Sequence, residues 1–224
     1  MTDDAPGRRI YDITLPLHTR LAGWPGDTPF DFHLAWQQSA GASVNVGVLT
    51  MSVHTGTHAD APFHFDAEGA TVDALPLDAF LGPARVLDVR AAIVSRGPGA
   101  RLTAADLAPA GPDLAHAPRL LLRTDAWTDH TRFPEAVPTL AEDAVAFLSA
   151  HGTRLVGVDL PSIDALDSTT LPVHRAVHRA GIQVLENLDL RNVPAGRYEL
   201  IALPLKLAGA DGAPVRAVLR EERR

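Results

Sequence analysis

Residues 53–65 constrain this chain more than any other stretch, and they read Val-His-Thr-Gly-Thr-His-Ala-Asp-Ala-Pro-Phe-His-Phe. They include three of the ten histidines together with one carboxylate. Neutral imidazole and carboxylate are ligands that divalent zinc, manganese or iron accept, and hydrophobic packing gives no reason to gather them so densely. The stretch therefore predicts a metal site, and a polar surface loop is the alternative.

The spacing within this stretch favours the metal site. The four side chains that could bind a metal lie an even number of residues apart, so an extended chain would project them from one side: His54, His58, Asp60 and His64. Full extension would nevertheless hold the first two histidines roughly 13 Å apart, too far to share an ion bound at about 2.0–2.1 Å. We therefore expect the chain to bend at Gly56 and Pro62 to interrupt regular structure before His64.

The composition narrows the class of protein. A chain of 224 residues with 46% hydrophobic residues can form one domain with its own core. The net charge of -7 disfavours nucleic acid or an anionic membrane as the main partner. The absence of cysteine restricts a metal site to nitrogen and oxygen ligands. Neither the first residues nor any later run has the pattern of a signal peptide or a membrane span, so we expect a cytoplasmic enzyme.

Strand and helix patterns are mixed along the chain without strict alternation. Runs rich in apolar and β-branched residues predict strands at 9–15, 43–53, 85–89, 119–124, 154–158, 182–185, 198–205 and 214–219. Helices are predicted at 77–81, 103–107, 140–150 and 174–180, the third with a capping box formed by Thr139 and Glu142. This mixture predicts a single α/β domain over residues 1–224, with a mixed, barrel-like sheet flanked by helices and flexible ends at 1–8 and 221–224.

The histidine stretch closely resembles the signature of the metal-dependent cyclase family. Further blocks similar to that family follow in the same order, at residues 24–29, 121–125, 157–162, 186–188 and 199–206. The Trp-Pro-Gly-Asp segment that begins at Trp24, together with the short chain, favours the family's bacterial kynurenine formamidase branch. The resemblance implies a swivelling β/β/α type of fold, two zinc ions per chain and a homodimer. Manganese remains open, because the same ligand types suit it.

The resemblance also implies a role for particular residues. It places His54, His58 and Asp60 around one zinc, and it completes a second site with a histidine and a glutamate twelve residues apart. His174 and Glu186 have that separation. The local pattern alone leaves His178 open as the ligand, because it lies one helical turn beyond His174.

The implied reaction is the hydrolysis of N-formyl-L-kynurenine to L-kynurenine and formate in tryptophan degradation. His64 is implied as the catalytic acid and base, and Trp24 as the residue that stacks on the aromatic ring of this small-molecule substrate. A serine mechanism is disfavoured, because the chain has no Gly-x-Ser-x-Gly motif. The alternatives are an isatin hydrolase-like or other aryl amide hydrolase of the same family, with a different pocket around Trp24, Trp127 and Phe133, and a non-catalytic metal-binding protein.

Overall fold

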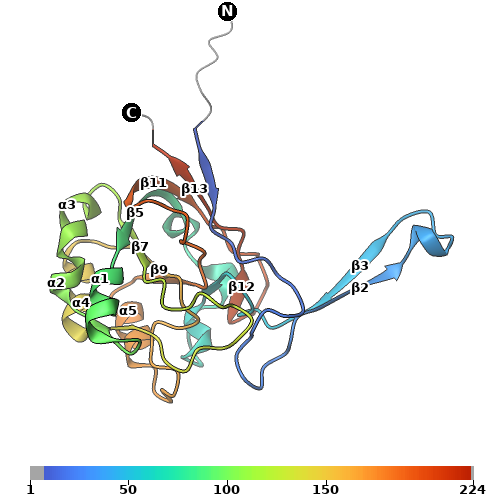
Figure 1. Cartoon of the computed structure of the whole chain (residues 1–224), viewed down its shortest axis with the longest axis horizontal. Helices are drawn as coiled ribbons and strands as arrows, with labels where there is room; N and C mark the ends of the chain where they lie inside the picture. The colour runs from blue at the N-terminus through green and yellow to red at the C-terminus, as the bar shows by residue number, and fades with distance from the viewer. Residues whose placement is uncertain (1–7, 223–224) are drawn as a thin grey trace, which may run out of the picture.

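The computed structural model describes residues 8–222, and its main feature is one mixed sheet that curls into a half-barrel (Figure 1). From one edge to the other, the strands are β1 (Ile10–Asp12), β13 (Val218–Glu221), β11 (Gly196–Ile201), β5 (Leu81–Asp88), β7 (Arg119–Arg123), β9 (Leu155–Val158), β10 (Gln183–Glu186), β4 (His58–Asp60) and β12 (Gly212–Pro214). The central strands β5, β7, β9 and β10 are parallel, and the strands on both sides of them pair antiparallel.

Helices cover one face of the parallel strands, because each parallel connection must cross over the sheet. Figure 1 shows them together on the left of the molecule: α1 (Arg90–Arg96), α2 (Ala104–Leu107), α3 (Gly111–Leu114), α4 (Glu142–Ala150) and α5 (Pro172–Arg179). A two-stranded parallel sheet, β6 (Arg101–Leu102) with β8 (Thr139–Leu140), lies beside them. Short 3₁₀ turns occur at Gln38–Ala40, Pro62–His64, Val72–Ala74, Leu77–Ala79 and Ala108–Ala110.

Two hydrophobic clusters fill the two faces of the sheet. On β7, Leu120 and Leu122 belong to the cluster under the helices, whereas Leu121 between them belongs to the cluster inside the curl. All three are fully buried. Successive side chains of a strand point to opposite faces, so the continuous apolar run of β7 is what a strand buried on both faces requires.

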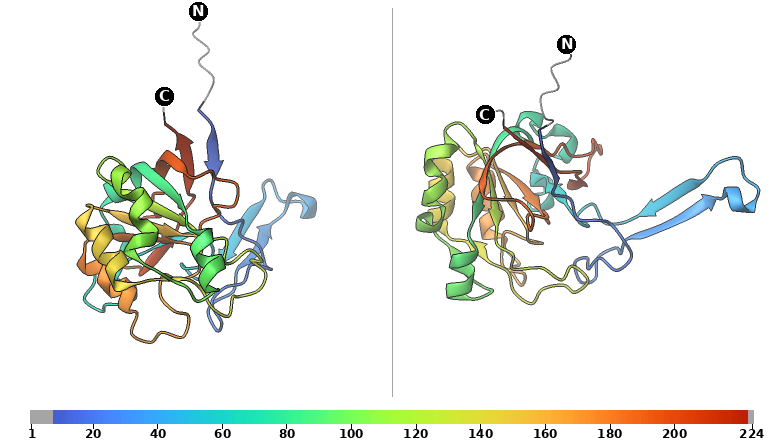
Figure 2. Two further views of the ribbon diagram at one scale, coloured as in Figure 1. Left: turned by 60° about the vertical axis from the view of Figure 1, so that its left-hand side comes forward. Right: turned by 45° about the horizontal axis from the view of Figure 1, so that its top comes forward.

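A hairpin projects from this body as a long arm, which the two views of Figure 2 show clear of the sheet and the helices. The arm comprises residues 31–50, and its strands β2 (Asp31–Trp36) and β3 (Val46–Thr50) pair antiparallel. Every residue of β3 is exposed, as is every residue of β2 except the half-exposed Leu34. The arm therefore contributes nothing to the two clusters of the body.

The structure confirms the predicted α/β class with a mixed, curled sheet, and it corrects two predicted helices. The helix predicted at 77–81 is a 3₁₀ turn at Leu77–Ala79, and Leu81 already begins β5. Helix α4 begins at Glu142, and the capping box predicted for Thr139 and Glu142 is wrong. Thr139 and Leu140 instead form β8, where the Thr139 amide donates to the Ala100 carbonyl at 3.0 Å. Parallel pairing with β6 thus takes the residues that the sequence pattern assigned to the first turn.

Two further expectations concern the chain ends and the membrane. Residues 1–7 and 223–224, which make up most of the ends expected to be flexible, lie outside the described residues. Arg8 forms an ion pair with Glu199 at 3.4 Å, and Glu221 belongs to β13. Within residues 8–222, no helix combines the length and apolar character that a bilayer crossing requires.

Candidate metal centre

The centre is built on two neighbouring strands, β4 and β10. They pair antiparallel in a register that places His58 opposite Glu186 and Asp60 opposite Val184. His58 and Asp60 are two residues apart on β4, so their side chains leave the same face of the strand. A histidine and two carboxylates are thereby brought together by sheet register alone.

The turn before β4 adds His54, in agreement with the predicted bend. Gly56 has φ of +68°, a left-handed conformation that glycine adopts without steric cost. The bend places the ring centroids of His54 and His58 4.9 Å apart. After β4, the 3₁₀ turn that begins at Pro62 carries His64, whose ring centroid lies 4.1 Å from that of His54.

Asp60 lies at the middle of the donor cluster. Its Oδ1 is 3.0 Å from Nδ1 of His54 and 3.2 Å from Nε2 of His58. Its Oδ2 is 3.3 Å from Nε2 of His174, which the first turn of α5 contributes. The Glu186 carboxylate faces the rings of His58 and His174, with one oxygen 3.6 Å from Nε2 of His58 and the other 3.3 Å from Nε2 of His174. The five residues form two overlapping groups, His54–His58–Asp60 and Asp60–His174–Glu186, each with donor atoms within 4.8 Å of one another.

Each of the three imidazoles has its other nitrogen against an oxygen acceptor outside the cluster. Nδ1 of His58 lies 2.8 Å from the Gly56 carbonyl oxygen, and Nδ1 of His174 lies 2.7 Å from Oδ2 of Asp164. Nε2 of His54 lies 2.9 Å from Oδ2 of Asp211. Such contacts place the hydrogen on the outer nitrogen and leave the inner nitrogen free to bind a metal.

Asp164 and Asp211 were not identified from the sequence. Besides contacting His174, the Asp164 carboxylate accepts hydrogen bonds from the backbone amides of Val173 and His174, both at 2.9 Å. These are amides of the first turn of α5 that no helical carbonyl can satisfy, so Asp164 fixes the helix start and the imidazole together. The available signal was an aspartate shortly after a predicted strand, a position that turns also favour.

The charges in the cluster favour imidazolium and carboxylate when no cation is bound. Burial alone would lower the pKa of His54, but its hydrogen bonds with Asp60 and Asp211 raise that pKa to about 9. Burial would likewise lower the pKa of His174, yet contacts with Asp164, Asp60 and Glu186 raise it well above the usual value. Burial favours a neutral Asp60, but the three imidazoles hold its pKa well below the usual range. Two buried carboxylates thus require positive charge, which a divalent cation would supply in place of protons.

His178, the alternative to His174, lies away from the donor cluster. It is exposed, and the Phe65 ring, whose centroid lies 5.7 Å from that of His178 and 5.5 Å from that of His174, stands beside both histidines. His174, in contrast, is only 3% exposed and is one of the five donor residues. The geometry of the helix therefore separates the two histidines that sequence spacing left open.

A cavity of about 320 Å³ opens over the cluster, and its wall includes His54, His58, His64, His174 and Glu186. Trp24 and Phe133 form an aromatic side of the cavity, with ring centroids 5.1 Å apart at an angle of 71°. Ser162 also lines it. Trp127, which was expected in the pocket of the isatin hydrolase-like alternative, is buried and does not line this cavity, and its indole N–H donates to the Arg132 carbonyl at 2.8 Å.

The fold is shared with proteins described as metal-dependent hydrolases, and in this chain it carries a buried cluster of histidines and carboxylates. Among solved structures, the chain is similar to a protein from Bacillus stearothermophilus described as a "predicted metal-dependent hydrolase", with 30% identity, a TM-score of 0.75, and coverage of 96% of this chain and 99% of that one. It is also similar to isatin hydrolase A from Labrenzia aggregata, with 26% identity, a TM-score of 0.81, and coverage of 96% and 94%.

The sequence comparisons identify the family. The model of the family Cyclase, described as "Putative cyclase", matches residues 11–165. A protein named kynurenine formamidase from Bacillus cereus is 46% identical over 215 residues, which cover 93% of this chain and 96% of that protein. The chain belongs to the Cyclase family, as the resemblance of the histidine stretch predicted.

Proposed function

We propose that this chain is a metal-dependent amide hydrolase that converts N-formyl-L-kynurenine and water to L-kynurenine and formate. The observation that carries this proposal is the cluster of three histidines and two carboxylates, each imidazole held from outside, at the base of a cavity with an aromatic side. The 46% identity to a protein named kynurenine formamidase supports the choice of substrate.

The proposed ligands suit two divalent ions. His54, His58 and Asp60 would hold the first, and His174 and Glu186 would hold the second, with Asp60 shared between them. We propose zinc, because nitrogen and oxygen donors of this kind are common at catalytic zinc sites, and manganese is the alternative to be tested. When bound, such ions supply Lewis acidity that polarises an amide carbonyl and makes water acidic enough to attack near neutral pH.

The chain's own residues would orient the substrate and move the proton. Trp24 and Phe133 would bind the aromatic ring of the substrate, which places the formyl group toward the donor cluster. A C–O bond to water forms at the formyl carbon, and the C–N bond then breaks. His64 lines the cavity outside the five donors, so its imidazole is free to take a proton from the attacking water and pass it to the departing aniline nitrogen.

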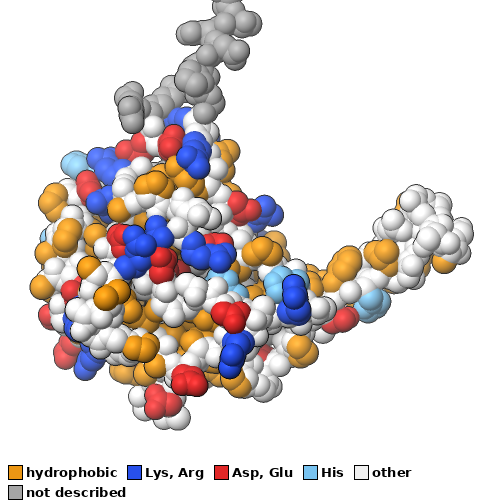
Figure 3. Space-filling view, viewed as in Figure 1, with side chains coloured by type: hydrophobic (Ala, Val, Ile, Leu, Met, Phe, Trp, Pro, Cys, Tyr) orange, Lys and Arg blue, Asp and Glu red, His pale blue; other side chains and the backbone are white. Residues whose placement is uncertain are grey.

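The proposal includes a homodimer in which each arm is covered by the second copy. Three large apolar side chains of the arm are exposed: Phe32 (54%), Trp36 (59%) and Leu49 (54%). Figure 3 shows hydrophobic side chains at several points along the arm. An isolated two-stranded hairpin is only marginally stable in water, and a flat apolar ribbon invites association. Residues 31–50 contain one acidic residue and no lysine or arginine, so the arm can meet an identical chain of net charge -7 without strong repulsion.

Turnover of N-formyl-L-kynurenine by the purified full chain tests the proposal. Isatin is assayed in parallel, metal content is measured on the same sample, and both assays are repeated after chelation and after the return of zinc or manganese. Fast hydrolysis of formylkynurenine that chelation abolishes and zinc restores is expected. Preferential hydrolysis of isatin would replace the substrate, and a fully metallated protein inactive on both would overturn the catalytic proposal. The proposed cytoplasmic location is checked by cell fractionation.

A further inference from the structure

We propose that Asp211 is a positioning residue. One oxygen of its carboxylate, Oδ2, orients both the metal ligand His54 and the proton carrier His64. This inference rests on the roles proposed above for the two histidines. Asp211 lies just before β12, 157 residues after His54. It belongs to neither of the two groups that the five donor residues form. Its Oδ2 is 2.9 Å from Nε2 of His54 and 3.4 Å from Nδ1 of His64.

The first consequence concerns the tautomer of His54. Its Nδ1 faces Asp60, the carboxylate that also contacts the other two imidazoles of the cluster. Nδ1 must therefore be unprotonated to bind an ion, and the hydrogen must reside on Nε2. A carboxylate only accepts hydrogen bonds, so Asp211 fixes that tautomer and turns the ring. Asp211 does for His54 what Asp164 does for His174 and the Gly56 carbonyl does for His58.

The second consequence concerns His64. The same Asp211 oxygen faces Nδ1 of His64, which places a hydrogen on this nitrogen and leaves Nε2 as the atom that can exchange a proton with a substrate. A carboxylate that orients an imidazole in this way also stabilises the imidazolium that forms when the ring accepts a proton. The Asp211 side chain therefore contacts both the metal ligand His54 and the acid–base residue His64, whose ring centroids lie 4.1 Å apart.

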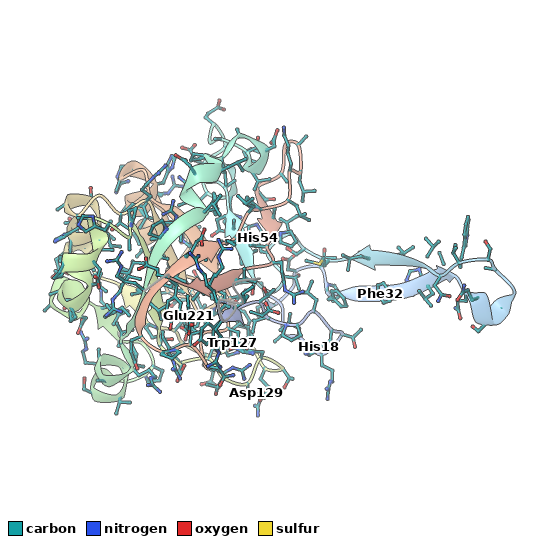
Figure 4. All side chains as sticks on the ribbon, turned by 90° about the horizontal axis from the view of Figure 1, so that it is seen from above. His18, Phe32, His54, Trp127, Asp129 and Glu221 are labelled. Atoms are coloured by element: carbon teal, nitrogen blue, oxygen red, sulfur yellow. The ribbon has the colours of Figure 1, made fainter. Side chains whose placement is uncertain are left out.

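The backbone around Asp211 is held against the signature strand. The Ala61 amide donates to the Asp211 carbonyl at 2.9 Å, and Gly212 pairs with Asp60 in the β12–β4 register. A Cβ atom at Gly212 would come within 2.8 Å of Cε1 of His54, so only glycine allows this close approach. Figure 4 labels His54 in the body, on the side from which the arm projects.

A cation is the alternative occupant, because donor atoms of His54, His64 and Asp211 also lie within 4.8 Å of one another. With Nδ1 of His54 directed to the first site, a second ion on Nε2 would require an imidazolate that has lost both hydrogens. Hydrogen bonding to Asp211 needs only the neutral ring. The geometry therefore points to positioning.

The test compares Asp211→Asn with Asp73→Asn in the full chain. Asp73 is the matched control, because its carboxylate accepts from the Gly209 amide at 3.1 Å and so supports the same loop without touching either histidine. Zinc affinity is measured by competition with a chromophoric chelator, which needs no substrate. We expect Asp211→Asn to weaken zinc binding about 10- to 100-fold and Asp73→Asn to leave it within about threefold.

A second readout separates the two partners of Asp211. At saturating zinc, Asp211→Asn should lower kcat about 10-fold with little change in KM, and adding it to His64→Ala should cause no further loss. His64→Ala alone should bind zinc as the unmutated chain does. The proposal is overturned if Asp211→Asn changes neither quantity, if Asp73→Asn matches it, or if the unmutated chain holds a third zinc that Asp211→Asn loses. An inactive unmutated chain would contradict the proposed reaction but leave the zinc comparison valid.

Discussion

Nε2 of His174 lies 3.3 Å from Oδ2 of Asp60, although 114 residues separate the two in sequence. The contact joins the first turn of α5 to β4, and β10 between them delivers Glu186 to both. The second proposed metal site therefore exists only when the sheet order and the position of α5 are correct. Its ligands report directly on the tertiary fold.

Replacing His174 should remove the second metal, whereas replacing His178 should not. The two histidines lie on the same helix, but only His174 is buried among carboxylates, and His178 is exposed. We expect His174→Ala to retain about one zinc in place of two and to lose activity about 100-fold or more. His178→Ala serves as the control and should keep both. The zinc content of both variants is measured after exhaustive dialysis. Loss of metal in His178→Ala alone would make His178, and not His174, the ligand.

Replacing His64 should separate catalysis from metal binding. His64 lies outside the five donors, and its ring nitrogen Nδ1 contacts Asp211 rather than Asp60. We therefore expect His64→Ala to lower turnover of formylkynurenine about 100-fold or more while zinc content stays unchanged. Both quantities are measured on one preparation. A variant that loses zinc would make His64 a ligand and remove it from the acid–base role.

Asp159 should make the free energy of unfolding depend on pH below neutrality. Burial raises the pKa of this carboxyl to about 6, even though Thr124 and the Asp125 amide donate hydrogen bonds to it. A carboxyl with a raised pKa in the folded state contributes stability that is complete below its unfolded pKa and is lost as the pH rises through about 6.

Comparison with Asp159→Asn isolates this contribution. Between pH 4 and 7, the unmutated chain should lose up to roughly 3 kcal/mol relative to the variant, because the amide cannot ionise. Urea unfolding of both chains at matched metal content measures the difference, and the other titrating groups cancel because both chains share them. A difference that is constant over this pH range would show that the folded carboxyl titrates normally.

The sequence predicted the parts of the site that are close together in the chain. His54, His58, Asp60 and His64 lie within one short stretch. The bend at Gly56 was predicted because an extended chain would hold the first two histidines too far apart to bind one ion. His174 and Glu186 required the family resemblance, because nothing local separates a buried histidine at the start of a helix from an exposed one a turn later. The class of fold followed from the mixture of strand and helix patterns.

Features set by tertiary contacts were not predictable in the same way. Asp164 and Asp211 occur in segments that resemble ordinary turns, and only the folded chain brings them to His174 and His54. Residues 43–53 have the β-branched pattern of a strand, but that pattern does not reveal that β3 pairs with β2 away from the body. The start of α4 was misplaced because pairing of β8 with β6 competes with a helix over Thr139 and Leu140.

The arm should control the oligomeric state. Large exposed aromatic side chains at the centre of an interface commonly contribute about 2 kcal/mol or more each, so Trp36→Ser combined with Phe32→Ser should weaken the proposed dimer at least roughly 100-fold. Val94→Ser on α1 is the control, because Val94 is 86% exposed but lies on the body. Sedimentation equilibrium over a range of concentrations measures the dissociation constant. We expect the unmutated chain and Val94→Ser to be dimers and the arm variant to be a monomer, whereas an unmutated chain that stays monomeric at micromolar concentration would leave the apolar arm without the partner proposed for it.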